Sequence, residues 1–113
     1  MRHRRLTAGR AVWAACLAWA AAPLANAQTP APSPRLLGVT ESILNYCGPR
    51  DPSAAARLRQ KIKQLVQGAS TQQLAEVRQS NEYRKAYESV VDFTAKIDEH
   101  NVKRFCAENP VAR

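Results

Sequence analysis

Apolar residues recur every three or four positions along most of the chain after residue 35. Between Glu82 and Ala107, placing residues about 100° apart gathers the apolar and small side chains on one side of a helix and the charged ones on the other. The apolar side consists of Tyr83, Ala86, Tyr87, Val90, Phe93, Thr94, Ile97 and Phe105. No segment shows the strict apolar–polar alternation of a half-buried strand. The pattern predicts an all-α fold whose last helix runs from Glu82 to Ala107.

Two helices are expected ahead of this one, each with local start or stop residues. The first runs from Leu36 to Tyr46, and Gly48 ends it, because glycine suits the left-handed residue after a helix and the proline that follows cannot continue one. The second begins at Asp51, an acidic N-cap followed by proline at the first helical position, and ends at Gly68. Its core-facing residues are Ala55, Leu58, Ile62 and Leu65.

A third helical segment is expected after a polar turn. Ser70 and Gln73 have the spacing of a capping box, which opens a helix. A continuous helix from Ser70 to Cys106 would be about 55 Å long, more than twice the length of its partners. We therefore expect a break at residues 79–81, and a small bundle of three to four helices.

The first 27 residues have the composition of a secretory leader. A cluster of arginines precedes an alanine-rich apolar run from Ala11 to Ala22, and Pro23 ends that run. The run is about 12 residues long, short of the ~20 that cross a bilayer, so we expect removal of the leader rather than anchoring. Lipid modification of Cys16 is the alternative, but too few apolar residues precede it. The expected cleavage site is formed by Ala25, Asn26, Ala27 and Gln28.

The remaining chain divides into a tether and one domain. Residues 28–34, rich in proline, are expected to form a disordered tether, and residues 35–113 the helical domain. Only two cysteines follow the leader, so an exported protein would join Cys47 to Cys106. That bond closes a loop of about 60 residues and is worth about 4 kcal/mol in the chain-entropy model. A redox-active pair would instead need closely spaced cysteines.

Charge and residue content argue against several classes of function. Four of the 17 Lys/Arg residues lie in the expected leader, so the remaining chain carries +4 of the formal +8. This mild excess, together with export, argues against a nucleic-acid partner. His100 is the only histidine after the leader, and neither a methionine nor a C-x-x-C-H motif accompanies it. We therefore expect no metal, no cofactor, no catalytic residue and no transmembrane segment in the exported chain, and no enzymatic activity.

The second helix carries the most informative charge pattern. Four basic residues flank its apolar stripe, and no acidic residue lies between positions 54 and 67 to neutralise them: Arg57, Arg59, Lys61 and Lys63. One interpretation is a face for an anionic partner. An acidic protein surface is favoured over lipid headgroups or an acidic polymer, because a membrane-surface helix would carry Trp or Phe. The other interpretation is that the basic side chains only cover the edges of the core with their stems.

A further cluster lies at the predicted break, between Asn81 and Tyr87. Arg84 and Lys85 would border the surface there, whereas Tyr83 and Tyr87 would lie at the core edge with their hydroxyls reaching water. The candidate partner-binding residues are therefore Arg57, Lys61, Arg84 and Lys85.

The plan of a small helical domain with one disulfide is similar, in architecture and without any specific motif, to periplasmic acid-stress chaperones and to small periplasmic immunity or inhibitor proteins. The leading hypothesis is a periplasmic or secreted, non-catalytic protein that binds another envelope protein as an inhibitor, immunity protein or adaptor. The alternative is a periplasmic stress chaperone that acid loosens, because protonation of its nine carboxylates leaves a strongly positive chain. A structural component of an envelope complex is the third hypothesis.

Overall fold

The computed structural model describes residues 30–109, which form five helices and no strand. The helices are α1 (Pro34–Cys47), α2 (Pro52–Leu65), α3 (Thr71–Gln79), α4 (Asn81–Thr94) and α5 (Glu99–Glu108). The all-α expectation is confirmed, whereas the expected number of three to four helices is wrong for this part of the chain. The predicted leader and its cleavage residues Ala25, Ala27 and Gln28 lie outside the described residues.

Side-chain caps explain where the first three helices begin. The Ser33 hydroxyl accepts a hydrogen bond from the Leu36 backbone N–H at 3.2 Å, so α1 begins at Pro34, inside the segment that the sequence assigns to the tether. The Asp51 carboxylate accepts from two backbone N–H groups at the start of α2, as its N-cap position predicts. The capping box of Ser70 and Gln73 at the start of α3 is also confirmed.

The glycine expected to leave α1 in a left-handed conformation does not do so. Gly48 has φ −50° and ψ −53°, which continues the right-handed helix, and its N–H donates to the Leu44 carbonyl at 2.7 Å. Pro49 is left to end the helix, since proline cannot supply the next N–H. The left-handed glycine is Gly68, with φ 83°, in the turn that follows α2.

The predicted single helix from Glu82 to Ala107 is wrong, because it is divided into α4 and α5. The Thr94 hydroxyl donates to the carbonyls of Val90 and Val91, at 2.9 and 3.1 Å, in the last turn of α4. The Asp98 carboxylate then accepts from the His100 N–H and caps α5. A single straight helix would carry Cys106 away from the end of α1. The disulfide therefore requires the chain to turn between Thr94 and Glu99, where α4 ends and α5 begins. The break at residues 79–81 is confirmed, since Ser80 ends α3 and caps α4.

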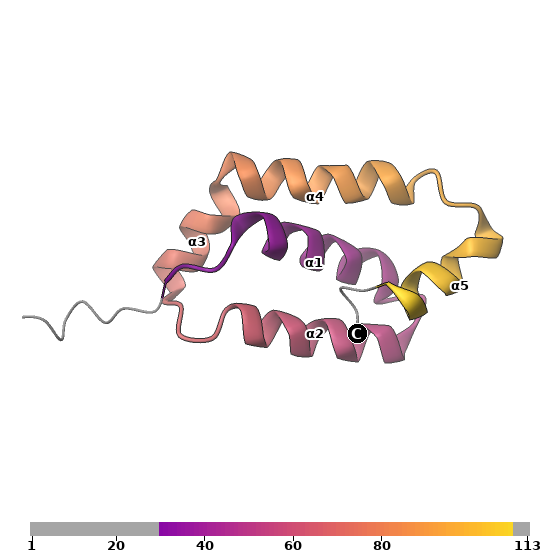
Figure 1. Cartoon of the computed structure of the whole chain (residues 1–113), viewed down its shortest axis with the longest axis horizontal. Helices are drawn as coiled ribbons and strands as arrows, with labels where there is room; N and C mark the ends of the chain where they lie inside the picture. The colour runs from indigo at the N-terminus through magenta and orange to yellow at the C-terminus, as the bar shows by residue number, and fades with distance from the viewer. Residues whose placement is uncertain (1–29, 110–113) are drawn as a thin grey trace, which may run out of the picture.

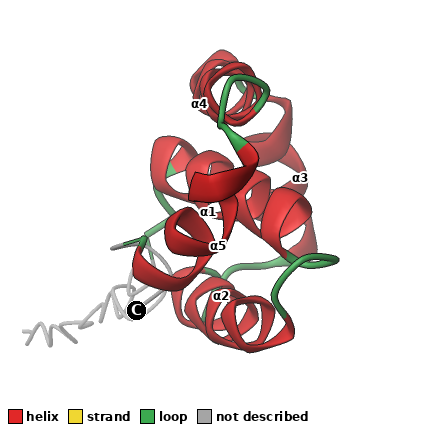
Figure 2. Ribbon diagram, turned by 90° about the vertical axis from the view of Figure 1, so that its right-hand side faces the viewer, coloured by secondary structure: helices red, strands yellow, loops and turns green. Residues whose placement is uncertain are grey.

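Helix α1 lies in the middle of the bundle, with α4 packed along one side and α2 along the other (Figures 1 and 2). Helix α4 runs in the same direction as α1, and α2 runs in the opposite direction (Figure 1). Helix α3 crosses the end where α2 finishes and α4 begins. Helix α5 turns back at the other end, where α1 finishes (Figure 1). The faces of α2 and α4 that point away from α1 are therefore on opposite sides of the molecule.

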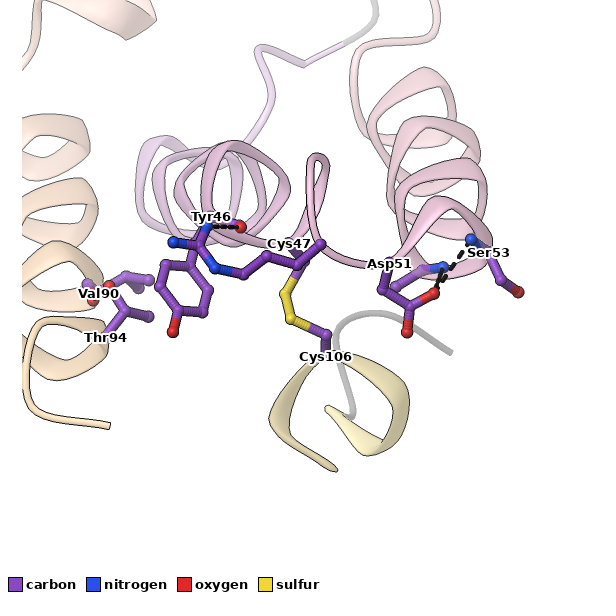
Figure 3. Close-up of a disulfide and its surroundings, with 9 residues drawn as sticks. Tyr46, Cys47, Asp51, Ser53, Val90, Thr94 and Cys106 are labelled. Atoms are coloured by element: carbon purple, nitrogen blue, oxygen red, sulfur yellow. Dashed lines mark hydrogen bonds between the residues drawn. A yellow bond between two sulfur atoms is a disulfide. The ribbon is translucent and has the colours of Figure 1, made fainter. Parts of the chain in front are cut away.

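The core is densest where α1, α2 and α5 meet. Ile43 and Cys47 from α1 pack there with Ala54 and Leu58 from α2 and with Cys106 from α5, and all five are buried. Cys47 and Cys106 form the predicted disulfide, with an S–S distance of 2.01 Å, which joins the end of α1 to α5 (Figure 3). The bond therefore links helices whose cysteines are 59 residues apart in sequence.

No helix between residues 30 and 109 combines the length and the apolarity that crossing a bilayer demands.

Candidate functional site

The structure divides the four predicted partner-binding residues between two surfaces. Arg57 and Lys61 lie on α2, whereas Arg84 and Lys85 lie on α4, on the other side of α1 (Figures 1 and 2). Arg84 and Lys85 also border two different hollows. Arg84 borders a hollow with Tyr83, Tyr87 and Glu88, and Lys85 borders another with Arg35, Glu82 and Ser89. A single patch made of all four residues is therefore excluded.

Arg57 and Lys61, by contrast, border the same surface feature. A shallow hollow of about 370 Å³ is lined by residues of α2 alone: Ala56, Arg57, Gln60, Lys61 and Gln64. Its walls are mostly apolar, because they are formed by Ala56 and the stems of long side chains, and the amide and cationic ends of those side chains supply its polar groups. Arg57 donates to the Ser53 hydroxyl one turn earlier, at 3.0 Å, which orients its guanidinium along this face.

The basic charge of α2 is not neutralised by acids of its own helix. Helix α2 contains four basic residues and no Asp or Glu, and the carboxylate of Asp51, just before it, caps its first turn. Within residues 30–109, no carboxylate lies within ion-pair distance of Arg59, Lys61 or Lys63. Arg59 and Lys63 therefore stand in solvent and Lys61 is half-buried, on a helix whose opposite side packs against α1.

A second polar feature, which sequence reasoning missed, joins three helices at Glu41. Its carboxylate on α1 accepts hydrogen bonds from the Tyr83 hydroxyl of α4 at 2.5 Å and from Arg78 Nε of α3 at 3.0 Å. Arg78 Nη2 donates to the second carboxylate oxygen, so the pair is bidentate. The Glu41 side chain is only 17% exposed. The one signal in the sequence was that Glu41 is the only acidic residue of α1.

The environment of Glu41 shifts the pKa values of all three groups. Burial alone would raise the pKa of Glu41, but the hydrogen bonds from Arg78 and Tyr83 outweigh it and lower the pKa below the usual value. The bond to Glu41 raises the pKa of Arg78, and burial together with that carboxylate raises the pKa of Tyr83. The prediction that the Tyr83 hydroxyl reaches water is therefore wrong, because a long-range carboxylate binds it.

Glu41 and Tyr83 also border a groove between α2 and α4, the two helices that lie on either side of α1. Its volume is about 290 Å³, and its lining comes from three helices: Glu41, Leu44, Asn45, Ile62, Tyr83 and Tyr87. The rings of Tyr83 and Tyr87 lie 5.9 Å apart along one wall. Because the one carboxylate in the groove is already bound by a tyrosine and an arginine, the Glu41 cluster holds α1, α3 and α4 together rather than offering a free acid.

An aromatic cluster lies on the other flank of α4. Phe93 is 58% exposed, and its ring lies 5.7 Å from that of Phe105, which in turn meets Tyr46 edge-on at 6.0 Å. The Arg50 guanidinium lies 4.1 Å from the centre of the Tyr46 ring, in a cation–π contact. Tyr46 lies beside the disulfide (Figure 3), and the ring contacts pack α5 against the ends of α1 and α4.

Within residues 30–109, the two cysteines are bonded to each other and the one histidine is exposed. Cys47 and Cys106 are fully buried and bonded to each other, so neither presents a thiol. His100 lies exposed in the first turn of α5, with Asp98 3.5 Å from its ring nitrogen Nδ1. In the described part of the chain, no group of three or more His, Cys, Asp or Glu side chains is placed to hold a metal ion.

Comparison of the chain with protein-family models, with curated proteins and with solved structures gave no match.

Proposed function

We propose that this protein is an exported, non-catalytic binding protein that acts on another protein of the cell envelope, as an inhibitor, immunity protein or adaptor. The contact surface is the outer face of α2, which carries Arg57 and Lys61. Arg84 and Lys85 lie on the far side of α1 and do not belong to this surface.

The observation that carries the proposal is the unbalanced charge of α2. Its inner side is buried against α1 through Ala54, Ala55 and Leu58, which holds the helix in place, while Arg59 and Lys63 on its outer side are exposed to solvent. Lys61 is half-buried, so covering the edge of the core with its aliphatic stem is enough to explain its position. Arg59 and Lys63 are exposed, and this explanation does not account for them. A rigid row of cations suits an acidic protein surface, since complementary charge speeds and orients association.

Affinity capture tests this proposal. The tagged full chain, expressed in its own host, is recovered from envelope extract beside a variant carrying Arg57→Glu and Lys61→Glu. We expect one protein at near-equal amounts with the wild type and its loss with the variant, while the helical circular dichroism stays unchanged. A matched variant, Arg84→Glu with Lys85→Glu, should retain the partner. A diffuse set of unrelated proteins, or none, would contradict a dedicated partner.

A second candidate function is a chaperone that acid loosens, and the Glu41 cluster favours it. Below its lowered pKa, Glu41 becomes neutral and its hydrogen bonds to Arg78 and Tyr83 weaken, which loosens the contact of α1 with α3 and α4. Acidified chains would also carry roughly +13 of repelling charge. Exposure of apolar surface at pH 2–3, measured by dye binding with the disulfide intact, is the expected result. A bundle that stays rigid at that pH would exclude this function.

A structural role in an envelope complex is the third candidate, and capture separates it from the first. A subunit of a complex would bring down several proteins in fixed ratios, whereas a dedicated inhibitor or adaptor would bring down one.

A further inference from the structure

The outer face of α2 is organised in three parallel rows. At about 100° per residue, Gln60 marks the middle of this face, and Arg57 and Lys61 lie roughly 60–100° to one side of it. Arg59 and Lys63 lie at the same angles to the other side. Between these two basic rows runs a row of neutral side chains: Ser53, Ala56, Gln60 and Gln64.

Burial agrees with this arrangement. All four residues of the neutral row are exposed, as are Arg59 and Lys63, whereas Arg57 and Lys61 are half-buried. The opposite side of the helix consists of buried Ala54, Ala55 and Leu58. The hollow is lined by Ala56, Gln60 and Gln64 of the neutral row and by Arg57 and Lys61, so it lies between these two rows. The face is therefore uncharged along its middle, and positive along both edges.

We propose that this face binds an acidic α-helix of the partner protein, which lies along α2 with a row of carboxylates on each edge. The proposal rests on the proposed function, since it names the part of the partner that the α2 face would recognise. Helices that pack side by side interdigitate their side chains along the contact line, and charges at the two edges of such a contact set the choice of partner and its orientation.

The dimensions of α2 define what fits. Its 14 residues give a length of about 21 Å, so the partner helix needs three to four turns to use the whole face. Within each basic row the two cations are four residues apart, one helical turn, so carboxylates four residues apart on the partner match them. A single row of positive charges would suit any anionic surface. Two positive rows on either side of a neutral row suit an anionic partner that is itself an α-helix.

A lipid surface fits this face less well. Helices that lie on membranes bury Trp, Phe or Leu side chains into the acyl region, with their basic residues around that apolar face. Here the apolar residues of α2 face α1, and the neutral row contains only serine, alanine and glutamine. Insertion would therefore require α2 to leave the bundle.

A designed peptide tests the proposal on the intact protein. The probe is a synthetic 18-residue helix with glutamates four residues apart along both edges and alanine between them. The control peptide has the same composition, with its glutamates in blocks of consecutive positions, so that they point to all sides of a helix. We expect the probe to bind at least about tenfold more tightly than the control in calorimetry, and binding to weaken steeply with added salt. Equal binding of the two peptides would show generic attraction of anions and overturn the helix proposal.

Variants of each row test the geometry. Arg59→Gln with Lys63→Gln, and separately Arg57→Gln with Lys61→Gln, should each weaken probe binding about tenfold, because each row contributes. The matched control is Arg84→Gln with Lys85→Gln on α4, which removes the same charge from the other side of the molecule and should leave binding unchanged. An equal loss with this control would mean that only net charge matters, and would overturn the proposal. Circular dichroism checks that every variant is folded.

Two further outcomes separate this inference from neighbouring hypotheses. Tighter binding to phosphatidylglycerol vesicles than to the probe would assign the face to lipid headgroups and overturn the proposal. If the captured envelope partner is retained by both α2 row variants, the binding function stands while its placement on α2 fails.

Discussion

Replacing Gly38 by alanine tests how closely α1 and α4 approach each other. A Cβ atom built on Gly38 would lie 2.6 Å from the Tyr83 carbonyl oxygen, 3.2 Å from Ala86 Cβ and 3.3 Å from Tyr83 Cδ2. The first contact is with backbone, which cannot rotate away as a side chain can. Ser42, one turn later on the same side of α1, donates its hydroxyl to the Tyr87 carbonyl at 3.1 Å. The two helix backbones are therefore held close along this seam.

Two opposing effects decide the sign of the change. Alanine is better than glycine inside a helix by about 0.8–1 kcal/mol, so without a close neighbour Gly38→Ala would stabilise the protein. Forcing a methyl group into a packed contact costs about 1–3 kcal/mol, and the contact with the Tyr83 carbonyl places this case at the upper end. We expect a net loss of about 1–2 kcal/mol, which lowers the melting temperature by roughly 5–15 °C in a domain of this size.

Thermal melting followed by circular dichroism at 222 nm measures the effect. Ala75→Gly, at an exposed position inside α3, is the matched control, since it reports the helix preference for alanine over glycine without the packing contact. It should destabilise by about 1 kcal/mol. A Gly38→Ala variant that melts at or above the wild-type temperature would refute the close packing of α1 on α4.

Three further predictions concern the polar cluster, the disulfide and the turn after α2. Glu41→Gln should lower stability by about 1–2 kcal/mol at pH 7, because charged hydrogen bonds are lost and the half-exposed Arg78 reduces the effect. The folded pKa of Glu41 lies below the usual value of about 4.3. Its contribution to the free energy of unfolding is therefore complete above about pH 4.3 and is lost as the pH falls below the folded pKa. Urea titrations should show the stabilities of the variant and the wild type converging toward pH 2. Cys47→Ala with Cys106→Ala should cost about 4 kcal/mol, and a melting temperature within a few degrees of wild type would contradict the role given to the bond. Gly68→Ala should cost about 1–2 kcal/mol in thermal melts because φ is 83°, and Gly68→Asn should cost less; equal stability of the three proteins would remove the requirement for a left-handed residue.

Local chemistry let the sequence alone determine where α2 and α3 start. The caps at Asp51 and Ser70 bind N–H groups two or three residues away, so their effect is complete within one turn and is visible in a short stretch of sequence. The disulfide partner was equally determined, because only Cys47 and Cys106 follow the predicted leader. The all-α class followed from the 3.6-residue period, which depends on the spacing of apolar residues along the chain and on nothing distant.

Only the tertiary structure decided which surfaces lie together. The basic residues of α2 and α4 appear equivalent along the sequence, but α1 lies between the two helices, so Arg57 and Arg84 belong to different faces (Figure 1). The partners of Glu41 are 37 and 42 residues away, a distance at which no periodicity carries information. The apolar pattern continues through the division between α4 and α5, and only the Asp98 cap, which binds the His100 N–H, was a local signal of it. Contacts within one helical turn can be predicted from neighbouring residues in the sequence. Contacts between helices depend on how all the helices pack together.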